Sequence, residues 1–176
     1  VAYSTFTILQ VNKGGDAYLV QFDNPGAVVL RGGRHLNYGA SERTIAGKLI
    51  SESTFTVQTG DVFLLMSDGV IHAGVGKSLN FGWQRENVMQ YAESRYTPAL
   101  SAKSLAVQML EACRNLYMGA PGDDTTIAVL KVRERKLVNL MIGPPENRDD
   151  DLKIAELFFS REGRHIVCGG TTAHVV

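Results

Sequence analysis

The chain has 176 residues, of which 44% are hydrophobic and 20% are charged, a composition typical of one compact globular domain with room for a small appendage. Eighteen basic residues balance eighteen acidic ones, so the formal net charge is zero. No basic stripe or polybasic stretch indicates binding to nucleic acid or to a membrane surface, and the sequence shows neither a signal-peptide pattern nor an apolar run long enough to span a bilayer.

The N-terminal part of the chain predicts a β-meander. The sequence opens with Val1, directly in a strand pattern, as expected of a fragment or an excised domain. Residues 2–11 and 17–22 are rich in β-branched and aromatic side chains, and the turn-forming residues 12–16 separate them. This pattern is typical of a β-hairpin.

The strands that follow are shorter. An apolar strand is predicted at residues 27–30, between turn signals at 24–26 and 32–33. Residues 37–48 are expected to form a looser connection. Alternation of threonine with apolar residues over 51–57 predicts a further strand.

The middle of the chain combines buried strands with helices. The apolar run at residues 61–67 predicts a buried central strand. A helix is expected at 83–95, and Ser101 is a suitable N-cap for a second one that ends near 119–122. Apolar side chains recur on one face of this second helix: Leu105, Met109, Ala112, Cys113 and Leu116. Residues 126–132 predict another buried strand.

The chain changes character after a charged link at residues 133–136. Apolar runs at 137–142 and 165–168 predict two strands. A helix is predicted between them at 150–159, with its apolar side formed by Leu152, Ala155, Phe158 and Phe159. We therefore expect residues 133–176 to form a small β-α-β-like appendage.

The two cysteines, Cys113 and Cys168, lie far apart and have neither CxxC nor zinc-finger spacing. Cys113 falls on the apolar face of a predicted helix, so we interpret it as a buried thiol. Unpaired cysteines favour a reducing cytoplasm as the compartment.

Two acidic motifs stand at the ends of predicted buried strands. Asp68-Gly69 closes the strand at 61–67, and Asp123-Asp124 precede the strand at 126–132. A carboxylate at a strand end is held rigidly, and hard divalent cations such as Mg²⁺ and Mn²⁺ take oxygen ligands. Each motif alone is also compatible with an ordinary turn or turn cap. Their joint presence favours a metal site.

These motifs also carry a resemblance to a known family. The segments GDVFLLMSDGV at residues 60–70 and GDDTTIAVL at 122–130 resemble the SpoIIE-like branch of the PPM phosphatases, and the likeness extends over residues 1–132, which we take as the phosphatase domain. The resemblance implies an α+β fold, an antiparallel β-sandwich flanked by helices, here incomplete at its N-terminus.

The resemblance further implies a site with two Mn²⁺ or Mg²⁺ ions. Asp68 and Asp123 would be ligands of one ion, with Asp124 beside them as a supporting or substitute ligand. A metal-activated water would hydrolyse phosphoserine or phosphothreonine in a protein. The implied substrates are phosphoproteins of the anti-anti-sigma type, in bacterial signalling during sporulation or stress response.

The sequence departs from the family pattern at one point. Family members carry an earlier Asp-Gly whose carboxylate bridges both metals, and nothing before Asp68 matches it. Asp16 and Asp23 have the wrong neighbours. We therefore expect an active parent protein and a fragment that is weakly active or inactive. The alternative is a non-catalytic PPM-like regulatory domain that binds a protein partner. No P-loop or GxGxxG motif supports nucleotide binding.

Four other features are weaker candidates. Arg31, Arg34 and His72 could contact a phosphate, although a solvated turn or loop is the favoured interpretation. Residues 169–172, Gly-Gly-Thr-Thr, could form a backbone nest for an anion or a plain glycine-rich turn before a helix.

Overall fold

The computed structural model describes residues 4–175. The chain divides into two compact units, one of residues 1–133 and one of residues 134–176. Each is described by itself below.

The first sheet of the larger unit contains four antiparallel strands in the order β1-β2-β6-β5. They are β1 (Phe6–Val11), β2 (Asp16–Phe22), β5 (Ser41–Ile45) and β6 (Lys48–Thr56). The predicted N-terminal hairpin is confirmed, because β1 pairs with β2 from Phe6 opposite Phe22 to Val11 opposite Ala17.

The hairpin of β5 and β6 corrects the looser connection expected at residues 37–48. Every residue of β5 is exposed, so no apolar alternation marks the strand in the sequence. The turn that follows is formed by Ala46 and Gly47, with φ of 50° and 76°. Asparagine or glycine is far more usual than alanine at the first of these positions, so the turn signal was weak.

The second sheet has the order β4-β3-β7-β8, again with antiparallel pairing. Its strands are β3 (Val28–Arg31), β4 (Arg34–His35), β7 (Val62–Met66) and β8 (Ile127–Lys131). The prediction of a buried central strand is confirmed by β7. The same prediction for residues 126–132 is wrong, because β8 is an edge strand in which every second residue is exposed.

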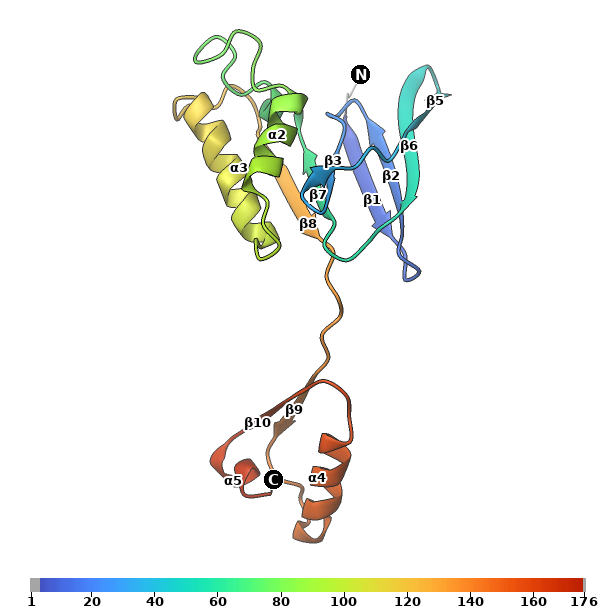
Figure 1. The fold of residues 1–176 in the computed structure, drawn as a ribbon, viewed down its shortest axis with the longest axis vertical. Helices are drawn as coiled ribbons and strands as arrows, with labels where there is room; N and C mark the ends of the chain where they lie inside the picture. Colours follow the sequence, from blue (N-terminus) through green and yellow to red (C-terminus); the bar gives the residue numbers. More distant parts are fainter. Residues whose placement is uncertain (1–3, 176) are drawn as a thin grey trace. The chain divides into compact units, whose positions relative to one another are not determined.

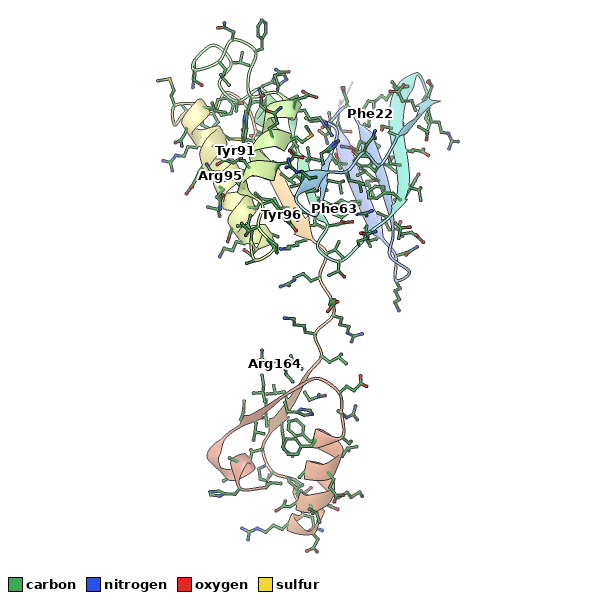
Figure 2. The ribbon with its side chains drawn as sticks, viewed as in Figure 1. Phe22, Phe63, Tyr91, Arg95, Tyr96 and Arg164 are labelled. Atoms are coloured by element: carbon green, nitrogen blue, oxygen red, sulfur yellow. The ribbon has the colours of Figure 1, made fainter. Side chains whose placement is uncertain are left out.

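The two sheets stack on each other (Figure 1), and a cluster of apolar side chains is buried between them. Ala17, Val29 and Phe63 form the centre of this layer, and Phe63 is labelled in Figure 2. Tyr38 and Phe55 pack against them, with the Phe55 and Phe63 ring centroids 6.0 Å apart. The interior is therefore built from alternate residues of both sheets.

Helices cover the opposite face of the second sheet (Figure 1). They are α2 (Arg85–Arg95) and α3 (Ala102–Leu116). Leu105, Met109 and Cys113 of α3 are buried against β7 and β3, as the predicted apolar face requires. Ser101 caps α3, since its side chain accepts a hydrogen bond from Ser104 N at 3.0 Å. The predicted fold, an antiparallel sandwich flanked by helices, is confirmed.

The smaller unit is a β-α-β structure, as predicted. It contains β9 (Val138–Ile142), a 3-10 turn (Arg148–Asp150), α4 (Asp151–Phe159), β10 (Arg164–Cys168) and α5 (Gly170–Ala173). Strands β10 and β9 are parallel. The helix face differs from the prediction: Ala155 and Phe158 are buried, whereas Leu152 and Phe159 are 71% and 53% exposed.

Candidate functional site

The Asp68 motif lies where β7 ends. A short helix that the sequence did not predict, α1 (Asp68–Ile71), begins immediately after the strand. Asp68 is exposed, and its Oδ1 accepts a hydrogen bond from Gly69 N at 2.9 Å. The Gly69 carbonyl accepts a hydrogen bond of 2.7 Å from the buried phenol of Tyr117, which follows α3. The buried strand and α3 thus hold the backbone beneath an accessible carboxylate.

The second motif lies in the loop between α3 and β8. Asp123 and Asp124 are both exposed. Asp123 Oδ1 accepts a hydrogen bond from Asp124 N at 2.7 Å, and the Thr125 hydroxyl donates to Asp123 O at 3.1 Å. These contacts are local to the loop, and the Asp123 side chain is accessible.

The fold brings the two motifs into contact. Gly69 lies so close to the loop that an added Cβ would come within 2.5 Å of Asp124 O. Ser67 Oγ donates to Asp124 O and accepts from Thr126 N, each at 2.9 Å. The segments that carry the sequence-predicted metal ligands therefore meet at one end of the second sheet, although some 55 residues separate them in the chain.

The electrostatics of Tyr117 are consistent with this proximity. Burial raises the pKa of the phenol, while a hydrogen bond with the Thr125 side chain lowers it. The charges of Asp123 and Asp68 raise the same pKa further.

The donor chemistry of the site suits a hard divalent cation, since all three candidate ligands are carboxylates. Within residues 4–175, however, no group of three histidine, cysteine, aspartate or glutamate side chains is arranged to hold a metal ion. The ligand type therefore fits Mn²⁺ or Mg²⁺, and the number of converging ligands falls short of a complete site. We refer to Asp68 and Asp123 together as the half-site.

The loop after α1 is fastened to the end of α3. Lys77 Nζ donates hydrogen bonds to Tyr117 O, at 2.9 Å, and to Ala120 O. Ser78 Oγ donates to Leu116 O at 2.7 Å. A lysine at a helix C-terminus also complements the helix dipole.

The residues that support the half-site were not predicted from the sequence: Ser67, Lys77 and Tyr117. A serine directly before Asp-Gly was the one available signal. The contacts of Tyr117 and Lys77 join segments about 40 residues or more apart, which no local pattern reveals.

The weaker phosphate candidates have other surroundings. Arg31 is not free to bind a phosphate, because it forms a bidentate ion pair with Asp61 through hydrogen bonds of 3.0 and 2.7 Å. The hydrogen bonding of its guanidinium to the Asp61 carboxylate raises the pKa of Arg31. Arg34 is 86% exposed and lies 3.9 Å from Glu93. His72 is an exposed residue at the end of α1.

Residues 169–172 form a turn that leads into α5. Gly169 has a φ of 99°, which favours glycine. The Thr172 hydroxyl accepts a hydrogen bond from Gly143 N at 2.9 Å and is buried. Residues 169–172 therefore form the glycine-rich turn before a helix, the second of the two predicted arrangements.

Two further observations bear on the class of protein. No helix within the described part of the chain is long and apolar enough to cross a membrane. Cys113 is buried and Cys168 is exposed, and both are free thiols.

Comparison with known proteins identifies the family. The family described as Stage II sporulation protein E (SpoIIE) matches residues 2–133. No curated protein matches the sequence.

Solved structures share the fold of the larger unit. The phosphatase domain of the cell fate determinant SpoIIE from Bacillus subtilis is similar with a TM-score of 0.62 and 18% identity, over 77% of this chain and 61% of that one. A Mn-presoaked structure of the same domain gives a TM-score of 0.60 and 15% identity, over 77% and 59%. The chain thus spans about three fifths of that domain. At this level of identity the likeness concerns the fold, while the family match rests on residues 2–133: the chain belongs to the SpoIIE family.

Proposed function

We propose that the larger unit acts in a metal-dependent phosphatase that hydrolyses phosphoserine or phosphothreonine in proteins. The observation that carries this proposal is the contact between Gly69 and the Asp124 carbonyl, which places the two acidic motifs at one end of the sandwich. Family membership and the shared fold support the reaction class.

In this proposal Asp68 and Asp123 hold a Mn²⁺ or Mg²⁺ ion, and Asp124 supports them. In a complete site, two such ions would lower the pKa of a bound water and would polarise the phosphate. The chain's own residues contribute charge and position: exposed carboxylates, fixed backbones and a buried strand beneath. Two or three carboxylates attract a divalent cation only weakly without further ligands, so we expect low affinity and low activity from this chain alone.

The substrate we propose is a phosphoprotein of the anti-anti-sigma type, and the compartment we propose is the reducing cytoplasm. The free state of Cys113 and Cys168 supports the compartment. The substrate proposal rests on the family alone.

A second function has one observation in its favour. Because no group of three metal-ligating side chains converges within residues 4–175, a non-catalytic domain that binds a protein partner is the alternative.

An activity assay distinguishes the phosphatase from the non-catalytic binding domain. It measures hydrolysis of p-nitrophenyl phosphate and of a phosphoserine peptide, with and without Mn²⁺. The assay is run on the 176-residue chain and on the longest natural form of the protein, each with an Asp68→Asn variant. Mn²⁺-dependent hydrolysis that falls at least 100-fold in the variant is expected, since loss of a metal ligand removes a large part of the charge stabilisation. Absence of hydrolysis from the longest form with both Mn²⁺ and Mg²⁺ would instead support the binding domain.

A further inference from the structure

The side chain of Ser67 joins the backbones of both acidic motifs. Its hydroxyl donates to Asp124 O and accepts from Thr126 N, across separations of 57 and 59 residues. Its own N–H donates to Thr126 O at 3.0 Å. Since Ser67 directly precedes Asp68, these bonds tie the position of one motif to the position of the other.

Besides Ser67, the loop of the second motif meets the first motif through Thr125, whose hydroxyl lies beside Gly69 and whose side chain hydrogen-bonds with the Tyr117 phenol. The paired strands β7 and β8 end at Met66 opposite Ile127. The hydrogen bonds from Asp124 N to Asp123 Oδ1 and from the Thr125 hydroxyl to Asp123 O are internal to the loop. Two like charges brought together repel each other unless other interactions offset the repulsion, so a fixed separation requires a connection of the kind that Ser67 makes.

Tyr117 also restrains the first motif. Its phenol is buried and donates to Gly69 O at 2.7 Å. The backbone at Asp68-Gly69 is therefore held by α3 as well as by the loop, and both attachments are hydrogen bonds from side chains that are not themselves carboxylates.

We propose that Ser67 and Tyr117 are positioning residues that set the separation of the Asp68 and Asp123 carboxylates and thereby the affinity of the half-site for a divalent cation. This inference rests on the proposed function, because it presumes that the half-site binds a cation. Residues that orient metal ligands commonly change metal affinity by about 10- to 100-fold when they are removed.

The first test measures the Mn²⁺ dissociation constant from the electron paramagnetic resonance signal of free Mn²⁺, well below the melting temperature of each variant. Ser67→Ala is expected to raise the dissociation constant roughly 10-fold. Ser67→Thr keeps the hydroxyl and is expected to restore the affinity. The matched control is Ser41→Ala, which removes a hydroxyl that donates to Glu52 O at 3.2 Å in the other sheet; it should leave the affinity unchanged.

The second test repeats the measurement with Tyr117→Phe, which keeps the ring in the core. Its control is Tyr38→Phe, because Tyr38 also donates from a phenol to a main-chain carbonyl, Ala27 O, at 2.9 Å. Both variants should lose similar stability, whereas only Tyr117→Phe should weaken Mn²⁺ binding. If Ser67→Ala does not fold, the comparison of Tyr117→Phe with Tyr38→Phe still tests the positioning role.

A melting temperature that falls while the Mn²⁺ affinity stays at the wild-type value would overturn the inference, since Ser67 and Tyr117 would then be structural only. That result would leave the proposed function standing. A wild-type chain that binds no Mn²⁺ would overturn the half-site and the positioning role together.

Discussion

At the scale of single residues, charged groups take two different roles in this chain. Asp68, Asp123 and Asp124 are exposed at the end of the sandwich. Asp61 is 1% exposed and fully engaged, since it binds Arg31 with both oxygens and accepts a further hydrogen bond from Gln58 N. Burial therefore separates the structural carboxylate from the candidate ligands.

Loss of Asp61 should destabilise the fold. Asp61→Ala leaves Gln58 N and the guanidinium of Arg31 without their acceptor, and we expect the free energy of unfolding to fall by about 2–3 kcal/mol. The value lies at the low end for buried pairs because Arg31 is 30% exposed and can be solvated. Arg34→Ala removes the exposed ion pair with Glu93 and should change the free energy of unfolding by less than about 0.5 kcal/mol. Urea unfolding checks both, and equal effects would contradict this assignment.

The two cysteines should differ in reactivity. Burial raises the pKa of Cys113 to about 11, so at pH 8 only about one molecule in a thousand carries its thiolate. Iodoacetamide at pH 8 should therefore label Cys168 in the folded chain and both cysteines in urea, as mass spectrometry can show. Rapid labelling of folded Cys113 would be inconsistent with this packing.

The raised pKa of Cys113 also makes the free energy of unfolding depend on pH. Between about pH 8.5 and 11 the Cys113 thiol ionises in the unfolded chain but stays protonated in the folded one. The unfolded state then binds fewer protons, so the free energy of unfolding falls as pH rises through this range. Urea unfolding at pH 8 and pH 10 checks this. The free energy of unfolding should decrease less between the two pH values in Cys113→Ala than in the wild type.

At the scale of elements, burial decided what the sequence could predict. Strand β7 is buried on both faces and α3 on one, so each left a clear apolar pattern. Strand β5 is exposed along its length and left none. Helix α1 has four residues, too few to show a 3.6-residue period.

The candidate site divides in the same way. The positions of Asp68 and Asp123 at strand ends were readable, because the strands themselves were. The bond from Tyr117 to Gly69 spans 48 residues, and such a contact becomes visible only when the helices have been packed on the sheet.

The cap of α3 provides a prediction at this scale. Ser101→Ala removes the acceptor for Ser104 N and should lower the free energy of unfolding by about 1 kcal/mol. Ser101→Asp supplies another acceptor at the N-terminus of the helix, where the dipole favours a negative charge, and should retain most of the wild-type free energy of unfolding. Thermal unfolding followed by circular dichroism makes the comparison. An alanine variant as stable as wild type would mean that the cap contributes nothing to the folded state.

At the scale of the whole molecule, the segment between the two compact units is accessible. Residues 132–137 have no regular secondary structure, and Arg133, Arg135 and Lys136 are exposed. Brief trypsin treatment should therefore cut there first, leaving a larger fragment that still unfolds cooperatively. Replacing these three residues by serine should slow the cut. First cleavage inside β1 to β8 would contradict the division into units.

The central claim is that the two acidic motifs bind one cation together, and Mn²⁺ binding to both motifs tests it most directly. In a Mn²⁺ titration followed by amide NMR, the signals of Gly69 and Asp124 should broaden in parallel with a single dissociation constant. Asp68→Asn removes a ligand and should raise that constant by more than the roughly 10-fold expected for Ser67→Ala. Asp23→Asn, which removes the same charge from an exposed residue with a φ of 53°, should leave it unchanged. Broadening confined to one motif, or equal weakening by both variants, would contradict a shared cation site at the end of the sandwich.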